Sequence, residues 1–303
     1  MNILEQELKK IGHFEFLAKQ TVDGFITGLH KSPYHGFSVE FSEHKQYSAG
    51  DSIRFVDWKV FAKTDKLYIK KFEEETNLRC RILLDISSSM FYPVENNGKI
   101  RFSSFAGACI AYLLQKQRDA FGVTFFDEKV GFQSQVKSTS AHLNMLFGEL
   151  EKISDQKSQN INLKSHVTEA IHALAESIHR RSLVVIFSDM MDNSSEQESI
   201  LNALLHLKHN KHEVLIFHVY DSKTELNLDF EDRPIEFVDI ETGEKVKLVT
   251  PEIKDLYKKK IEESSREIMI RCAQFKIDYV RADINEGVEK VLESYLVKRS
   301  KMS

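Results

Sequence analysis

The stretch RILLDISSSM, residues 81–90, joins a run of branched apolar side chains to a carboxylate and three serines. A continuous apolar run without alternation is typical of a strand that is covered on both faces of a parallel sheet. Ligands of open α/β sheets bind at the carboxyl ends of the strands, so Asp85, Ser87 and Ser89 are candidates for a site at the sheet edge. The same pattern is also ordinary turn and N-cap chemistry, in which short oxygen side chains accept hydrogen bonds from free backbone N–H groups.

Apolar runs and helical patterns alternate along the chain from Leu78 onward. This alternation predicts an α/β fold whose main domain, residues 78–303, has a mostly parallel sheet with helices on both faces. Besides the strand that ends at Asp85, the expected strands cover residues 121–127, 182–188, 214–220 and 278–282. The expected helices cover residues 100–118, 141–153, 164–180, 195–209, 251–275 and 286–298. Residues 129–135 should add an antiparallel edge strand, and residues 235–248 should form a hairpin.

A second strand, SLVVIFS at residues 182–188, also runs directly into a carboxylate, Asp189. The carboxyl ends of parallel strands meet at one edge of a sheet, so Asp189 should lie opposite the loop that carries Asp85, Ser87 and Ser89. These four side chains offer hard oxygen ligands. Mg²⁺ and Mn²⁺ favour such ligands and retain waters, which would leave a coordination position for an outside carboxylate.

Composition and charge exclude several classes of function. With 303 residues, 42% of them hydrophobic and 29% charged, the chain has the composition of a globular protein that can bury a sizeable core. The net charge of −4 argues against nucleic-acid binding as the main purpose, because phosphate recognition needs a basic surface. No apolar stretch approaches the ~20 residues of a membrane span. The three cysteines, Cys80, Cys109 and Cys272, have irregular spacing, which predicts free thiols in a reducing, cytoplasmic location.

Residues 1–77 are expected to form a helix and strand elaboration packed on the main domain, not an independent fold. Apolar residues at three- and four-residue spacing predict an amphipathic helix over residues 1–27, and short alternating segments predict strands at 37–41 and 67–70. The charged residues between Asp51 and Glu75 could form a partner-binding face or a salt-linked collar that covers a sheet edge. The aromatic side chains in the same segment favour the collar.

Several phrases carry a family resemblance. LLDISSSM, RDAFGVTFFDE and LVVIFSDMMD are similar to the von Willebrand factor A fold with its metal-ion-dependent adhesion site. The phrase EFSEHKQYSAGDSIRFVDWKVFAKTDKLYIKKFEEE, together with the tail phrase VDIETGEKVKL, resembles the bacterial family catalogued as domain of unknown function 58. The resemblance extends from about Gly36 to Arg299, and its most distinctive part lies between Tyr47 and Trp58.

The resemblance implies roles for particular residues. Asp85, Ser87 and Ser89 match the first metal loop of the adhesion site, and Asp189 matches its late aspartate. The adhesion site also uses a threonine, whose place is taken here by Ile161 in the phrase NINL. Water can replace the lost oxygen, but the affinity for Mg²⁺ or Mn²⁺ should fall, and an empty carboxylate cluster is an open alternative. The resemblance further implies a MoxR-type AAA+ ATPase as partner, with a role in protein assembly, activation or stress response.

An enzyme is the competing interpretation of the same residues. A strand that ends at an aspartate could belong to a Mg²⁺-dependent phosphohydrolase or phosphotransferase with Asp85 as its nucleophile. Such an enzyme needs a second acid two residues later as a general acid, and that position holds Ser87. The sequence also lacks the glycine motifs that bind nucleotide phosphates and the G-x-S-x-G elbow of serine hydrolases. We therefore expect a non-enzymatic protein-interaction module without catalytic residues.

Overall fold

The computed structural model describes the chain in ten segments, which cover residues 13–30, 44–46, 58–70, 78–96, 98–127, 130–156, 167–190, 197–230, 234–238 and 245–293. The chain divides into two compact units, one made of residues 1–26 and 78–303 and the other of residues 27–77. This division differs from the expected boundary at residue 77, because the N-terminal helix groups with the main unit. The packing of residues 27–77 on the main domain stays a prediction.

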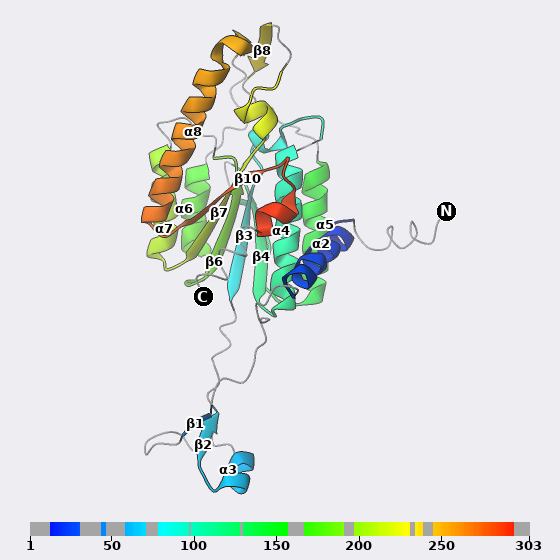
Figure 1. The fold of residues 1–303 in the computed structure, drawn as a ribbon, viewed down its shortest axis with the longest axis vertical. Helices are drawn as coiled ribbons and strands as arrows, with labels where there is room; N and C mark the ends of the chain where they lie inside the picture. The colour runs from blue at the N-terminus through cyan, green and yellow to red at the C-terminus, as the bar shows by residue number, and fades with distance from the viewer. Residues whose placement is uncertain are drawn as a thin grey trace, which may run out of the picture. The chain divides into compact units, whose positions relative to one another are not determined.

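A six-stranded sheet forms the centre of the main unit (Figure 1). Its strand order is β10-β7-β6-β3-β4-β5, and every neighbouring pair is parallel except β4 and β5. The strands are β3 (Arg79–Asp85), β4 (Ala120–Phe126), β5 (Val130–Gln133), β6 (Leu183–Ser188), β7 (Glu213–Tyr220) and β10 (Asp278–Asp283). The predicted α/β fold is confirmed, with a mostly parallel, Rossmann-like sheet and an antiparallel edge strand.

Helices cover both faces of this sheet (Figure 1). They are α4 (Gly98–Lys116), α5 (Ser140–Asp155), α6 (Val167–Ser177), α7 (Gln197–His209), α8 (Thr250–Gln274) and a last helix at 288–293. Ile82 and Leu84 of β3 pack in one apolar cluster with α4 and α5, whereas Leu83 packs in another with α6 and α7. Alternate side chains of a strand point to opposite faces, so both faces of β3 are buried. This explains why its sequence is apolar without alternation.

The N-terminal helix α2 (His13–His30) belongs to the first of these clusters. Phe14, Ala18 and Val22 are spaced four residues apart, share one face of the helix and are buried. The predicted amphipathic helix is therefore present, although it extends three residues beyond the expected end. Residues 1–12, which the prediction included, lie outside the described residues.

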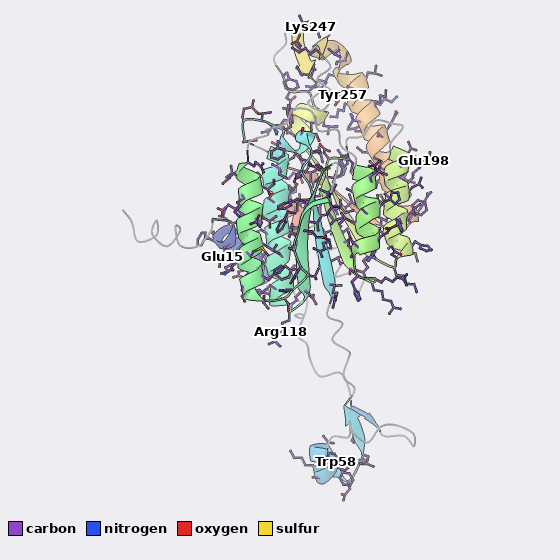
Figure 2. The ribbon with its side chains drawn as sticks, turned by 180° about the vertical axis from the view of Figure 1, so that it is seen from behind. Glu15, Trp58, Arg118, Glu198, Lys247 and Tyr257 are labelled. Carbon is purple, nitrogen blue, oxygen red and sulfur yellow. The ribbon has the colours of Figure 1, made fainter. Side chains whose placement is uncertain are left out.

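The smaller unit contains β1 (His44–Gln46) and β2 (Tyr68–Lys70), which pair antiparallel, and the short helix α3 (Trp58–Thr64). Trp58 is the first residue of α3 and is labelled in Figure 2. Its side chain is 61% exposed, and its ring contacts that of Phe61. The strand expected at residues 37–41 and most of the charged residues between Asp51 and Glu75 lie outside the described residues.

A two-stranded hairpin of β8 (Pro234–Val238) and β9 (Lys245–Val249) precedes α8 in the main unit, as predicted. Lys247 of the hairpin and Tyr257 of α8 lie at the same end of this unit (Figure 2). None of the helices in the described ranges combines the length and the apolar composition that crossing a membrane requires.

Candidate functional site

The carboxyl ends of β3 and β6 form the topological switch point of the sheet. From β3 the chain continues to β4 on one side, whereas from β6 it continues to β7 on the other. Loops diverge at such a point and leave a crevice, which is where open α/β sheets bind their ligands. Asp85 is the last residue of β3 and Asp189 follows the last residue of β6, and both side chains are buried. The two predicted acids therefore belong to one site.

Asp85 is held by groups of the protein itself. Its Oδ1 accepts a hydrogen bond from the N–H of Ser87 at 2.9 Å, and its Oδ2 accepts one from Ser188 Oγ at 2.6 Å. Ser188 Oγ in turn accepts a hydrogen bond from the N–H of Met190 at 3.1 Å. Burial, together with the nearby charge of Asp189, raises the pKa of Asp85 to about 6, although the hydrogen bonds from the serines oppose this rise.

The two predicted serine ligands lie on the turn after β3. Ser87 is the N-cap residue of a short 3₁₀ helix, η2 (Ser88–Phe91), but its side chain makes no capping hydrogen bond. Its Oγ lies instead 3.1 Å from Ser89 Oγ. The capping alternative therefore fails for the Ser87 side chain, whereas the hydrogen bond from Ser87 N–H to Asp85 is an ordinary turn contact.

A buried lysine that was not predicted from the sequence lies at the same edge. Lys99 is in the first turn of α4, and its Nζ donates to Asp189 Oδ2 at 2.8 Å and to Glu225 Oε1 at 2.5 Å. Its side chain is 1% exposed, against 4% for Asp189 and 14% for Glu225. Burial alone would lower the pKa of Lys99, but the two carboxylates outweigh it and the pKa lies above its usual value. The lysine is therefore a charged ammonium group.

Glu225 connects this ion pair to the loop after β7. It lies on η3 (Ser222–Leu226), a single π-helical turn, and its Oε2 accepts a hydrogen bond from the N–H of Asp221 at 2.7 Å. Burial raises the pKa of Glu225 above its usual value, although the Lys99 charge opposes this shift. One lysine thus links three segments that meet at the carboxyl edge of the sheet.

Helical periodicity could have located Lys99. Residues 102, 103 and 106 lie three, four and seven positions after it, so they share a side of the helix with Lys99, and all three are buried. A lysine on such a stripe needs a buried partner. No comparable signal exists for Glu225, because a single π-helical turn has no period in the sequence.

A second polar cluster lies at the ends of β7 and β10. Asp221 Oδ1 accepts a hydrogen bond from Asn285 Nδ2 at 2.6 Å, and its Oδ2 accepts one from Thr224 Oγ1 at 2.8 Å. Asp283 Oδ1 accepts hydrogen bonds from the backbone N–H groups of Asn285 and Ser222. These acids hold the two loops in place.

The contacts of the strand-end acids compete with the binding of a divalent metal ion. Both carboxylate oxygens of Asp85 accept hydrogen bonds, and the charge of Asp189 is already paired with Lys99. Within the described ranges, no group of three or more His, Cys, Asp or Glu side chains could hold a metal ion. Ile161, which stands where the adhesion site has threonine, lies outside the described residues. The Mg²⁺ or Mn²⁺ site at Asp85, Ser87, Ser89 and Asp189 stays a prediction, and these contacts count against it.

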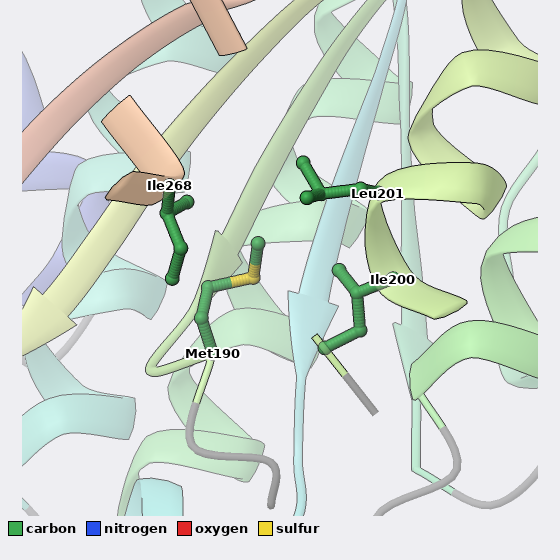
Figure 3. Close-up of a pocket in the computed structure, with 4 residues that line it drawn as sticks. All are labelled: Met190, Ile200, Leu201 and Ile268. Carbon is green, nitrogen blue, oxygen red and sulfur yellow. The ribbon is translucent and has the colours of Figure 1, made fainter. Parts of the chain in front are cut away.

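A small apolar pocket includes Met190, the residue that follows Asp189 (Figure 3). Its lining residues are Met190, Ile200, Leu201 and Ile268, so it brings together the loop after β6, helix α7 and helix α8. None of these side chains can act as an acid, a base or a nucleophile. The pocket therefore adds no catalytic group to the site.

Comparison with protein families gives one match that covers most of the chain. The family model described as "Protein of unknown function DUF58" matches residues 43–267. A relative from Mycobacterium tuberculosis, the uncharacterized protein Rv1480, is 24% identical over 209 residues. The match covers 69% of this chain, and the chain spans only 63% of the relative's length. An uncharacterized Mycobacterium bovis protein, Mb1516, gives the same figures.

Two solved structures resemble the chain at low identity. One is the conserved hypothetical protein BatB from Bacteroides thetaiotaomicron, with 15% identity, a TM-score of 0.44 and coverage of 74% of this chain and 99% of that one. The other is an aerotolerance-related membrane protein from Bacteroides fragilis, with 16% identity, a TM-score of 0.42 and coverage of 70% and 99%.

Proposed function

The chain belongs to the DUF58 family, whose function is unknown. From the geometry of the site, we propose that it is a non-enzymatic protein-interaction module built on a von Willebrand factor A-like domain. Three features support the von Willebrand A-like assignment. The parallel sheet has a single antiparallel edge strand, the Asp-x-Ser-x-Ser motif follows β3, and Asp189 follows the neighbouring strand β6.

Asp85 and Asp189 are buried and already bonded to other groups of the protein, and this observation favours a binding function over catalysis. An aspartyl nucleophile needs a carboxylate oxygen that can reach a phosphorus atom, with a cation beside it to hold the phosphoryl charge. Asp85 is fully buried and both of its oxygens accept hydrogen bonds, while the Lys99 ammonium is paired with two other carboxylates. The alternative of a phosphohydrolase that uses Asp85 has no comparable support.

A MoxR-type AAA+ ATPase is the partner that the family resemblance implies. Immobilised full-length chain should retain the purified ATPase in at least one of three conditions, with ATP, with ADP or without nucleotide. A chain whose fold is disrupted by a substitution in the core of β3, such as Leu84→Asp, serves as the control and should retain none. Failure of the wild-type chain to bind the ATPase in all three conditions would overturn this choice of partner.

The enzyme alternative and the metal prediction have separate tests. Turnover of phosphate esters that disappears in the Asp85→Ala variant would refute the binding-module proposal. Calorimetry with Mg²⁺ and Mn²⁺ tests the metal prediction, which requires a binding heat in the wild-type chain that Asp85→Ala abolishes.

We also propose a cytoplasmic location. All three cysteines, Cys80, Cys109 and Cys272, are buried free thiols, as proteins of reducing compartments commonly have. Cell fractionation tests this location. Detection of the chain in the membrane fraction or in an extracytoplasmic fraction would contradict the proposal.

A further inference from the structure

Lys99 is a buried cation between two carboxylates at the strand-end site. A lysine whose side chain is 1% exposed loses its hydration, and this loss is compensated only by close partners of opposite charge. Lys99 has two of them, Asp189 after β6 and Glu225 after β7. Its single charge therefore lies between carboxylates from two different strand ends, which is the location at which α/β sheets bind ligands.

The two carboxylate oxygens lie around Lys99 Nζ somewhat farther away than ligands lie around a bound metal ion. Its Nζ lies 2.8 Å from one carboxylate oxygen and 2.5 Å from the other. Calcium–oxygen distances in proteins are about 2.3–2.6 Å and magnesium–oxygen distances about 2.0–2.1 Å. If the lysine side chain were absent, the two carboxylates could bind a divalent ion after moving toward it by up to about 0.5 Å for Ca²⁺ and about 0.8 Å for Mg²⁺, and water would supply the other ligands. While Lys99 is present, its ammonium group fills this place.

The remaining surroundings of the ammonium group leave it inaccessible to an outside acid. The ring of Tyr92 lies 6.0 Å from Nζ, and the backbone N–H of Lys99 donates to the carbonyl of Tyr92 at 3.0 Å. Because the Lys99 side chain is 1% exposed, an outside carboxylate cannot reach the ammonium group without a rearrangement of the site.

We propose that Lys99 is a built-in cation, which supplies at the strand ends the positive charge that a divalent metal ion would otherwise supply. The site then keeps its shape without a metal ion, and a partner recognises the loops around it and not a metal-bound carboxylate. This inference shares one assumption with the proposed function, namely that the partner binds at this site.

The test is the thermal unfolding of the full chain with and without divalent ions. The wild-type chain should unfold at the same temperature in EDTA, Mg²⁺, Mn²⁺ and Ca²⁺ at matched ionic strength. Lys99→Ala should unfold on the order of 10 °C lower in EDTA, because two buried carboxylates lose their counter-charge. Divalent ions, but not Na⁺, should restore a large part of that loss.

Lys116→Ala is the matched control. Lys116 lies on the same helix and its Nζ is 2.5 Å from Asp23 Oδ1, but its side chain is 40% exposed. Removing an exposed ion pair has little effect on stability, so this variant should unfold within about 3 °C of the wild type. It should not respond to divalent ions.

Two results would overturn the proposal: a rise in the unfolding temperature of the wild-type chain with Mg²⁺ or Mn²⁺, or a Lys99→Ala variant that unfolds with the control and ignores divalent ions. If Lys99→Ala does not fold, the double variant Lys99→Met/Asp189→Asn is measured in its place. That variant has lost the charge of one of the two acids that face position 99, so it should fold and be more stable than Lys99→Met alone. Equal instability of the two variants would refute the charge argument. All these measurements use the isolated chain, so they can fail or succeed independently of the binding test with the ATPase.

Discussion

Two buried serines near the site differ in whether their hydroxyl groups have partners. Ser188 is fully buried, and its Oγ donates to Asp85 and accepts from the N–H of Met190. Ser103 on α4 is equally buried, but its Oγ has no hydrogen-bond partner among the described residues. A buried hydroxyl stabilises the fold when it is paired and costs desolvation free energy when it is not. The same substitution should therefore have opposite effects at the two positions.

Ser188→Ala should lower the free energy of unfolding by about 1.5–3 kcal/mol, because a buried carboxylate loses a donor. Ser103→Ala should leave it unchanged or raise it by up to about 1 kcal/mol, because an unpaired hydroxyl is removed and alanine favours the helix. Urea denaturation of the two variants measures both values. Equal destabilisation would show that volume, and not hydrogen bonding, determines the result.

At the scale of single residues, the sequence indicates the acids of the site but not their pairing. Asp85 and Asp189 follow apolar strands, and parallel strands bring their carboxyl ends together, so their proximity was predictable. The partners of Lys99 lie 90 and 126 residues away along the chain. Local periodicity reports only that a residue lies on a buried face, so it could place the lysine but not select its acids.

At the scale of elements, strands with strong apolar runs are predictable to within one or two residues. The prediction at 182–188 corresponds to β6 (Leu183–Ser188), and that at 121–127 corresponds to β4 (Ala120–Phe126). The η3 turn was not predicted, because one turn has too few residues for a period and depends on the contact of Glu225 with Asp221 N–H. The grouping of residues 1–26 with the main unit depends on where α2 packs, which no local pattern reports.

Gly122 of β4 and Gly148 of α5 differ in how much room a side chain would have. A Cβ at Gly122 in β4 would lie 2.7 Å from the carbonyl oxygen of Gln135 and 2.8 Å from Arg81 Nη1. Arg81 cannot move away freely, because it is buried and its Nη1 donates to the carbonyl of Ser134 at 2.6 Å. A Cβ at Gly148 in α5 would meet no atom within 4 Å.

Gly122→Ala should therefore lower the free energy of unfolding by about 1–3 kcal/mol through overpacking. Gly148→Ala is its control and should raise this free energy by about 0.5–1 kcal/mol, because alanine loses less backbone entropy in a helix. Chemical denaturation compares the two. A Gly122→Ala variant as stable as the wild type would mean that the segment at residues 134–135 can shift at little cost.

At the scale of the whole molecule, buried titratable groups make stability depend on pH. The folded chain binds a proton at Asp85 more readily than the unfolded chain, since its pKa is about 6 instead of 3.8. The stabilising contribution of protonated Asp85 is thus complete at low pH and is lost as pH rises toward 6. His218 on β7 behaves in the opposite sense, because desolvation lowers its pKa to about 4 from 6.5. Its contribution is complete above pH 6.5 and is lost as pH falls toward 4.

Each of these contributions amounts to about 3 kcal/mol over the full interval, so they largely offset one another in the wild-type chain between about pH 4 and 6.5. Asp85→Asn removes the Asp85 contribution, so the free energy of unfolding of this variant should rise with pH relative to that of the wild type. His218→Gln removes the other, and its free energy should fall with pH relative to the wild type. Urea denaturation at a series of pH values in this interval measures both differences. Parallel curves for all three proteins would mean that neither burial nor the charge of Asp189 perturbs these groups in the folded chain.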